Sequence, residues 1–273
     1  MSAHAPVAAF FDLDKTIIAT SSAFAFGKEF FKGGMITRQE AWEISLSKAQ
    51  YMLVGQSSEK MDTTRDTLAQ MVAGWEVEDI QRITRETLRE VVAPAIYAEA
   101  RELIAAHKNA GHHVIIISAS AKILVEPIAQ ELGVDTVVAT EMAVKDGRLT
   151  GDVTRYLKGG AKAEAVRQFA AEHHFDLDAS YAYSDSATDI PMLELVGHPV
   201  AVNPDRTLKK HALANGWQAR TFKNPEPLIQ MPHAREVGVG AGVIAGVTAL
   251  AVAGVFIARA VGGKGSDDKR HSA

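Results

Sequence analysis

Two aspartates, Asp12 and Asp14, stand one residue apart directly after the apolar run at residues 7–11. A buried carboxylate is costly, and two like charges this close disfavour each other's ionisation. A turn after a strand is the simplest explanation of such a pair, because Asp is common in turns. Further polar residues at the same edge of a sheet would instead indicate a site that needs both acids.

Such polar residues follow other predicted strands. In an open parallel sheet, ligands collect at the carboxyl ends of the strands. Ser118 follows the predicted strand "HHVIII", and Ser184 and Asp185 follow the predicted strand "ASYAY", with Asp189 one helical turn further on. Lys162 opens the helix predicted at 161–173. We therefore expect one site that contains Asp12, Asp14, Thr16, Ser118, Lys162, Asp185 and Asp189.

A hard cation would make this cluster of carboxylates tolerable. Mg²⁺ prefers carboxylate and water oxygens and keeps positions open for phosphate oxygens of a substrate. A carboxylate beside Mg²⁺ and a bound phosphate can act as a nucleophile and form an aspartyl-phosphate. The cluster thus predicts a magnesium site and phosphoryl chemistry on Asp12.

The elements that must position these residues follow an alternating pattern. Short apolar runs predict buried strands, and they alternate with amphipathic segments typical of helices. This predicts an α/β fold with a Rossmann-like parallel sheet over residues 1–20 and 93–222. Residues 21–92 show about four helical segments and little strand signal, so we expect an inserted all-helical domain. A hairpin is predicted to turn at Asp146-Gly147, and a helix is predicted with Pro127 near its first turn.

The chain resembles the haloacid dehalogenase-like hydrolases. The stretches that carry the resemblance are "FFDLDKT", "VIIISAS", "GAKAEAV" and "YSDSATDIPML", in the family's order and approximate spacing. Each is short, but the four in order make the resemblance specific, and it covers about residues 7–220. The branch that it resembles is subfamily IB, which contains phosphoserine phosphatase. The resemblance implies a Rossmann-like core with a helical cap inserted between the first two motifs.

The resemblance also implies a role for each matching residue. Asp12 matches the nucleophile and a Mg²⁺ ligand, and Asp14 matches the general acid/base, whose backbone carbonyl also binds the metal. Ser118 and Lys162 match the phosphate-binding residues. Asp185 matches a further Mg²⁺ ligand, and Asp189 matches the acid that supports the metal site and orients Lys162. Thr16 completes the first motif.

The chain departs from the family pattern in two places. Ser184 and Ser186 flank Asp185 where the family usually has glycine, and their hydroxyls could bond to the metal shell. Phosphoserine phosphatases also carry a glutamate a few residues after the first motif, which meets the amino group of the substrate. This chain has no acid between Asp14 and Glu29, which argues against L-phosphoserine as the substrate. Phenylalanines at 24, 26, 30 and 31 hint at a less polar leaving group, although packing explains such residues more simply.

The composition limits the other possibilities. The 273 residues carry a formal net charge of -4, so no basic face indicates a nucleic-acid partner. The absence of cysteine excludes disulfides and thiolate chemistry. Histidine pairs at 112–113 and 173–174 lack the spacing of a zinc site. The N-terminal residues have neither a basic region nor a long apolar region, so no signal peptide is expected.

The C-terminal region differs from the rest of the chain in composition. Residues 223–236 are polar and proline-rich, which is typical of a linker. The next 22 residues, 237–258, contain no charge and are long enough to cross a bilayer, whereas a buried core helix is the alternative. We predict a transmembrane helix at 237–259 and a polar tail at 260–273. This anchor would leave the catalytic domain cytoplasmic, and small residues at 238, 242 and 246 would permit a homodimer.

Three functions fit the sequence. The leading one is a membrane-anchored, Mg²⁺-dependent phosphomonoester hydrolase that acts on a small phosphorylated metabolite or a lipid phosphate. The second is a phosphotransferase of the same fold, which passes the phosphoryl group to an acceptor other than water. The third is a catalytically silent membrane adaptor, against which the complete set of carboxylates argues. A cation-pumping ATPase shares "DKT" but not the residues that follow it.

Overall fold

The computed structural model describes residues 5–37, 69–134 and 136–225. Within these ranges no helix combines the length and the apolar character that crossing a bilayer requires. The predicted span at 237–259 and the tail at 260–273 lie outside the described residues. So do residues 38–68 of the predicted insert and all but the first residues of the predicted linker.

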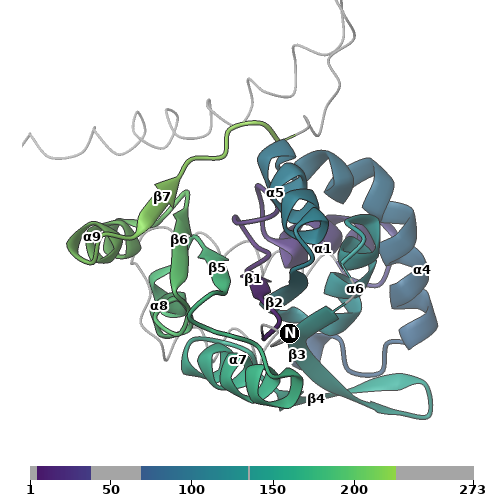
Figure 1. Ribbon diagram of the computed structural model, residues 1–273. Coiled ribbons are helices and arrows are strands. Elements are labelled where there is room, and N and C mark those ends of the chain that lie inside the picture. Colours follow the sequence, from purple (N-terminus) through teal and green to yellow (C-terminus); the bar gives the residue numbers. More distant parts are fainter. Residues whose placement is uncertain (1–4, 38–68, 135, 226–273) are drawn as a thin grey trace, which may run out of the picture. The chain divides into compact units, whose positions relative to one another are not determined.

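A seven-stranded sheet forms the centre of the described fold (Figure 1). Its strand order is β4-β3-β2-β1-β5-β6-β7, and all neighbours are parallel except β3 and β4. The strands are β1 (Ala8–Phe11), β2 (His113–Ala121), β3 (Thr136–Lys145), β4 (Arg148–Arg155), β5 (Tyr181–Ser184), β6 (His198–Val202) and β7 (Gln218–Arg220). The prediction of a mostly parallel α/β sheet is confirmed.

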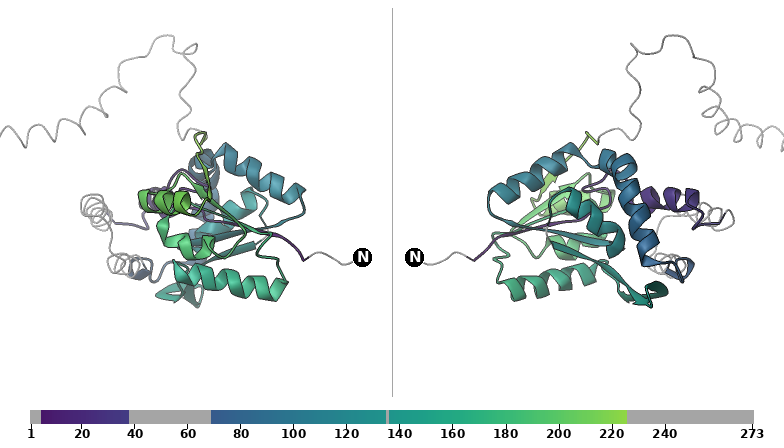
Figure 2. Two further views of the ribbon diagram at one scale, coloured as in Figure 1. Left: turned by 60° about the vertical axis from the view of Figure 1, so that its left-hand side comes forward. Right: turned by 90° about the vertical axis from the view of Figure 1, so that its right-hand side faces the viewer.

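The central strands are apolar throughout because both faces of the sheet are covered. In β1, Ala9 and Phe11 belong to one buried cluster, whereas Ala8 and Phe10 belong to the other. Helices α5 (Ala98–Asn109) and α6 (Lys122–Glu131) pack on the first face. Helices α7 (Gly160–His173), α8 (Ile190–Leu193) and α9 (Arg206–Ala214) pack on the second. Figure 2 shows α7 (green) and α5 (blue) on opposite sides of the sheet.

The sheet places the predicted site at a switch point. After β1 the chain continues to β2 on one side, and it later returns to β5 on the other side of β1. Connections that leave a central strand in opposite directions open a crevice at the carboxyl ends of the strands. Asp12 and Asp185 lie at this edge just beyond the carboxyl ends of β1 and β5, and Ser118 lies in β2 where its regular pairing with β3 ends.

The described part of residues 21–92 is helical. It comprises α1 (Ser22–Lys32), α4 (Val77–Thr87) and the π-helical turn η1 (Leu88–Val92), which runs on into η2 (Ala93–Ala95). The two chain segments that join this region to the sheet lie side by side. Ile18 pairs with Ile96, and the Ala19 amide donates to the Ala95 carbonyl at 2.8 Å. The insert is thus attached through two adjacent connections.

Two local predictions have different outcomes. The hairpin between β3 and β4 turns at Asp146 and Gly147, as predicted, and both residues have positive φ (51° and 76°), as a two-residue hairpin turn requires. The position of Pro127 was predicted wrongly. Helix α6 begins at Lys122, so Pro127 lies inside it instead of in its first turn. Packing of Val125 and Ile128 into the core stabilises α6 despite the hydrogen bond that proline removes.

Candidate active site

Asp12, Lys162 and Asp189 form a buried ion-pair cluster at the carboxyl edge of the sheet. The Lys162 Nζ donates to Asp12 Oδ1 at 2.6 Å and to Asp189 Oδ2 at 2.7 Å. The exposed fractions of the three side chains are 3% for Lys162, 9% for Asp12 and 3% for Asp189. Charges this buried are tolerated only when they are paired and hydrogen-bonded, so the three residues depend on one another.

Local backbone geometry brings the lysine to the carboxylates. Gly159 precedes α7 with φ 55° and ψ -121°, a conformation that favours glycine, and Lys162 is the third residue of the helix. Asp12 is fixed from the other side, because its amide donates to the Tyr183 carbonyl of β5 at 2.9 Å. Lys15, in the loop after β1, also has a positive φ of 63°. A non-glycine residue in this conformation costs about 1 kcal/mol or more, and such strain gathers at functional sites.

One ammonium serves two carboxylates, and this sets the electrostatics of the cluster. Burial, with smaller contributions from the charges of Asp189 and Asp14, raises the pKa of Asp12 to about 7 against the attraction of Lys162. Lys162 loses hydration on burial, but its two carboxylate partners raise its pKa above the ordinary value. The lysine therefore stays charged, and the cost of the excess negative charge falls on Asp12.

Asp189 has a supporting place in the cluster. Its Oδ2 accepts a second hydrogen bond from Ser184 Oγ at 2.8 Å. Although Asp189 stands at the start of α8, its side chain makes no capping hydrogen bond there. The structure therefore brings Asp189 to Lys162, as the sequence predicts. Ser184, one of the two serines that flank Asp185, is the donor of this hydrogen bond.

Asp185 extends the negative charge along the edge. It follows β5 and is partly buried, and burial raises its pKa to about 6 while Lys15 opposes the shift. Its backbone carbonyl accepts from the Asp205 amide at 2.8 Å. The Asp205 carboxylate in turn accepts from the amides of Ala187 and Leu208, so it ties the loop after β5 to the start of α9.

Asp14, Ser118 and Thr16 occupy different positions around the cluster. The Asp14 carboxylate accepts from the Ser22 amide and from Ser120 Oγ, both at 2.8 Å. Ser118 is buried at the end of the regular part of β2, and its Oγ accepts from the Ser120 amide at 3.1 Å. Thr16 is buried, and its Oγ1 has no hydrogen-bond partner in the described part of the chain. The structure places all seven predicted residues at this edge, but only Asp12, Lys162 and Asp189 bond directly to one another.

The donor set fits a hard divalent cation. Asp12 and Asp185 offer carboxylates with raised pKa values on neighbouring strands, and the single buried ammonium cannot neutralise the acids around it. In the described residues, no three His, Cys, Asp or Glu side chains converge on one metal position. A site of one or two carboxylates completed by a carbonyl and water is what Mg²⁺ ordinarily uses. Oxygen donors without histidine or cysteine agree with that metal.

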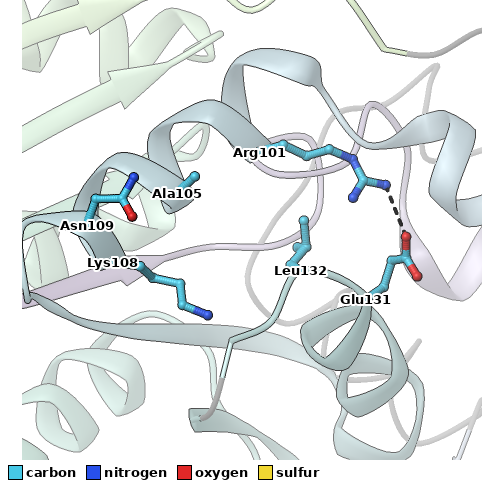
Figure 3. Close-up of a pocket in the computed structure, with 6 residues that line it drawn as sticks. All are labelled: Arg101, Ala105, Lys108, Asn109, Glu131 and Leu132. Carbon is cyan, nitrogen blue, oxygen red and sulfur yellow. Dashed lines mark ion pairs between the residues drawn. The ribbon is translucent and has the colours of Figure 1, made fainter.

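Surface hollows lie elsewhere on the fold. One, of about 270 Å³, is lined by residues of α5 and the end of α6, including Lys108 and the ion pair of Arg101 with Glu131 (Figure 3). Another, of about 450 Å³, lies between α5 and residues 220–222. None of the predicted site residues lines either hollow, so the candidate site rests on the contacts described above.

Comparisons with known proteins identify the family of the chain. The family model described as "haloacid dehalogenase-like hydrolase" matches residues 9–194. The chain belongs to the haloacid dehalogenase-like hydrolases. A probable phosphatase of Mycobacterium tuberculosis H37Rv is 46% identical over 93% of this chain and 89% of its own length. A phosphoserine phosphatase of the same organism is 34% identical over 87% of this chain and 79% of its own length.

A solved structure supports the fold of this hydrolase. The structure titled "Phospho-Aspartyl Intermediate Analogue of Phosphoserine phosphatase" superposes with a TM-score of 0.59 at 22% identity, over 81% of this chain and 95% of that one. This structure shows the shared fold, and the 34% identical relative places the hydrolase in the phosphoserine-phosphatase-like branch. The prediction of a phosphatase of this family is confirmed.

Sequence reasoning missed three contributors to the site of this hydrolase. Ser22 and Ser120 bind the Asp14 carboxylate, and Asp205 holds the loop that carries Asp185. The stretch Ser118-Ala119-Ser120 did carry a signal, since a second hydroxyl directly after a strand end is available to the same edge. No comparable signal marks Asp205, whose role depends on the packing of α9.

Proposed function

We propose that this chain is a Mg²⁺-dependent phosphomonoester hydrolase in which Asp12 is the nucleophile. The observation that carries the proposal is the way Asp12 is held. Lys162 binds Oδ1, while the described residues offer Oδ2 no hydrogen bond, so one carboxylate oxygen is fixed and the other is available. An oriented and partly desolvated carboxylate is suited to covalent catalysis.

The proposed reaction has two steps. In the first, Asp12 Oδ2 attacks phosphorus, the ester P–O bond breaks, and the leaving oxygen takes a proton from Asp14. In the second, water attacks phosphorus of the aspartyl-phosphate, Asp14 takes a proton from that water, and the Asp12 carboxylate is restored. The sum is a phosphate ester plus water giving an alcohol plus phosphate. One general acid/base that serves both steps in turn is chemically sufficient.

The other site residues bind and orient the phosphate. Lys162 and Ser118 match the phosphate-binding positions of the family, and Asp189 with Ser184 holds the Lys162 ammonium in place. Asp12, Asp185 and the carbonyl of Asp14 would hold Mg²⁺. When bound, the metal supplies positive charge for the phosphate oxygens and for the carboxylates around them.

We propose a small phosphorylated metabolite or a lipid phosphate as the substrate. One relative is named phosphoserine phosphatase, but this chain lacks an acid between Asp14 and Glu29 that could meet an amino group. Two of the four phenylalanines give no support to an apolar leaving group, whereas Phe31 is exposed. Phe26 and Phe30 are buried, and Phe30 packs against Trp75 with ring centroids 5.4 Å apart.

The test is phosphate release by the full chain, with Mg²⁺ and after its removal by EDTA. The substrates are p-nitrophenyl phosphate, phosphoserine, histidinol phosphate and lysophosphatidic acid. We expect Mg²⁺-dependent turnover that D12N abolishes and that D178N, a matched change at an exposed aspartate, leaves intact. Turnover that survives D12N would contradict the proposed nucleophile.

The same experiment separates the two alternative functions. Adding alcohols during turnover would divert the phosphoryl group to a phosphoalcohol if the protein is a phosphotransferase. Folded protein that binds Mg²⁺ but turns over no substrate in the panel would favour the catalytically silent adaptor.

We also propose that residues 237–259 anchor the protein in a membrane, with the hydrolase domain in the cytoplasm. This rests on the charge-free stretch 237–258 and on the polar segments that flank it. Extraction of membranes at alkaline pH tests it. The full chain should stay in the pellet, and a chain that ends at residue 236 should be released. Equal release of both would contradict the anchor.

A further inference from the structure

The Asp14 carboxylate lies at the end of a chain of hydrogen bonds formed by two serines to which the family resemblance assigns no role. Ser22 Oγ donates to Ser120 Oγ at 2.7 Å, and Ser120 Oγ donates to Asp14 Oδ2 at 2.8 Å. The other carboxylate oxygen, Oδ1, accepts from the Ser22 amide at 2.8 Å. Both oxygens are therefore oriented by two serines, which fixes the plane of the carboxylate.

The two serines belong to different parts of the fold. Ser120 lies in β2, where the pairing with β3 is irregular. Ser118 pairs with Ala139 and Ala121 pairs with Thr140, so two residues of β2 stand outside the ladder. The Ser120 amide donates to Ser118 Oγ, and Thr140 Oγ1 donates to the carbonyl of the other unpaired residue at 2.7 Å. Irregularities of this kind near active sites re-aim a side chain, here that of Ser120 toward Asp14.

Ser22 is the first residue of α1, the helix that begins the inserted region. It is completely buried, and it reaches the Asp14 carboxylate with its amide and Ser120 with its hydroxyl. The general acid/base of the core is thus bonded directly to the first helix of the insert. A shift of α1 away from the sheet would break two hydrogen bonds that orient Asp14.

We propose that Ser120 and Ser22 are positioning residues that hold Asp14 for proton transfer and link its orientation to the placement of α1. This inference rests on the proposed function, in which Asp14 gives a proton to the leaving group. A hydroxyl has one proton to donate, so while Ser120 donates to Asp14 its oxygen can only accept from Ser22, and the two bonds run in one direction toward the carboxylate. Replacing Ser120 should therefore affect Asp14 more than replacing Ser22. Ser120 contacts Asp14 with its side chain, whereas S22A retains the backbone amide that donates to Asp14.

The leaving group separates a role in proton transfer from a general loss of structure. An alkyl phosphate has a poor leaving group and needs the proton from Asp14, whereas p-nitrophenol leaves readily without it. We expect S120A to lower kcat/KM about 10- to 100-fold for an alkyl phosphate, the range for loss of one hydrogen bond to a charged group. For p-nitrophenyl phosphate we expect kcat/KM of S120A to fall by less than about 3-fold. S22A should lower kcat/KM for the alkyl phosphate less than S120A does, and S120T should restore it.

Ser21 provides the matched control. It neighbours Ser22 but makes no capping hydrogen bond to α1, so S21A should leave both substrates unaffected. An equal decrease for both substrates in S120A, or no decrease for either, would overturn the positioning role.

A second measurement does not depend on turnover. Urea unfolding of D14N, S120A and the double variant forms a cycle that reports coupling between the two side chains. We expect the shift in unfolding midpoint caused by S120A to be clearly smaller in the D14N background, and additive shifts would overturn the inference. If the wild type hydrolysed no ester in the panel, the proposed function would fail. The unfolding cycle would still show whether the side chains of Asp14 and Ser120 are coupled.

Discussion

Replacing the proposed nucleophile should stabilise the protein. Asp12 is buried with a second carboxylate beside a single ammonium, and its pKa is raised from 3.8 to about 7. The folded state therefore favours protonated Asp12. A tenfold change in a protonation equilibrium corresponds to about 1.4 kcal/mol, so ionised Asp12 costs the fold about 4 kcal/mol once the pH exceeds both pKa values. An asparagine keeps an acceptor for Lys162 and carries no charge.

The raised pKa of Asp12 determines how the stability difference between D12N and the wild type changes with pH. A raised folded pKa contributes stability that is complete below the unfolded value of 3.8 and is lost as the pH rises to about 7. The wild type should lose this contribution over that window, and D12N should not. We expect the advantage of D12N in free energy of unfolding to grow by about 2–3 kcal/mol between pH 5 and pH 8. At pH 8 the net gain should be about 1–3 kcal/mol, since the amide introduces N–H donors that need partners.

The assay is urea unfolding of the full chain in EDTA at several pH values between 5 and 8. D178N, at an exposed aspartate, serves as the control and should follow the wild type at every pH. Adding Mg²⁺ should narrow the gap, because a ligand that binds only the folded wild type stabilises it. D12N that is less stable than the wild type at pH 8, or an advantage that does not change with pH, would refute the electrostatic argument.

Three further predictions concern the surrounding residues. D185N should weaken the stabilisation of the fold by Mg²⁺, measured as a smaller shift of Tm at a fixed metal concentration; an unchanged shift would remove Asp185 from the proposed metal site. S184A should lower the free energy of unfolding by about 1–2 kcal/mol, because Asp189 loses a buried donor, and urea unfolding measures this. E99Q should speed tryptic cleavage after Lys223, because the Glu99 carboxylate binds the amides that follow β7. Burial acts to raise the pKa of Glu99, but hydrogen bonds from Lys223 and Asn224 lower it, so this contact should weaken in the wild type as the pH falls through the acid range.

Much of the fold was predictable because its physical signals are local. Strands buried on both faces must be apolar throughout, and β1, β2 and β6 are recognisable for that reason. The hairpin turn was predictable because Asp146-Gly147 can adopt the positive φ values that such a turn demands. The start of α6 was not, because proline biases the reading toward a first turn. The contacts that stabilise the helix around Pro127 come from residues distant in sequence.

The candidate site likewise contains some residues that could be predicted from the sequence and others that could not. Asp12, Lys162 and Asp189 could be predicted as a group because each follows or opens an element whose end lies at the same edge of the sheet. The bonds of Ser120 could not be predicted, since they depend on two residues of β2 leaving the ladder. Nothing in the apolar pattern of β2 marks where its pairing with β3 slips. The roles of Ser22 and Asp205 likewise depend on how α1 and α9 pack.

The edge of the sheet concentrates costs that the rest of the fold must offset. Asp12 and Asp185, acids with raised pKa values, lie there beside the buried ammonium of Lys162, and Lys15 adopts a strained φ in the loop after β1. None of these features stabilises the protein, whereas the two apolar clusters on either side of the sheet do. A cluster short of positive charge is a poor place for a phosphate dianion by itself. It would become a favourable one when a cation joins Lys162, so the imbalance that weakens the fold would make phosphate recognition by the proposed hydrolase depend on the proposed Mg²⁺.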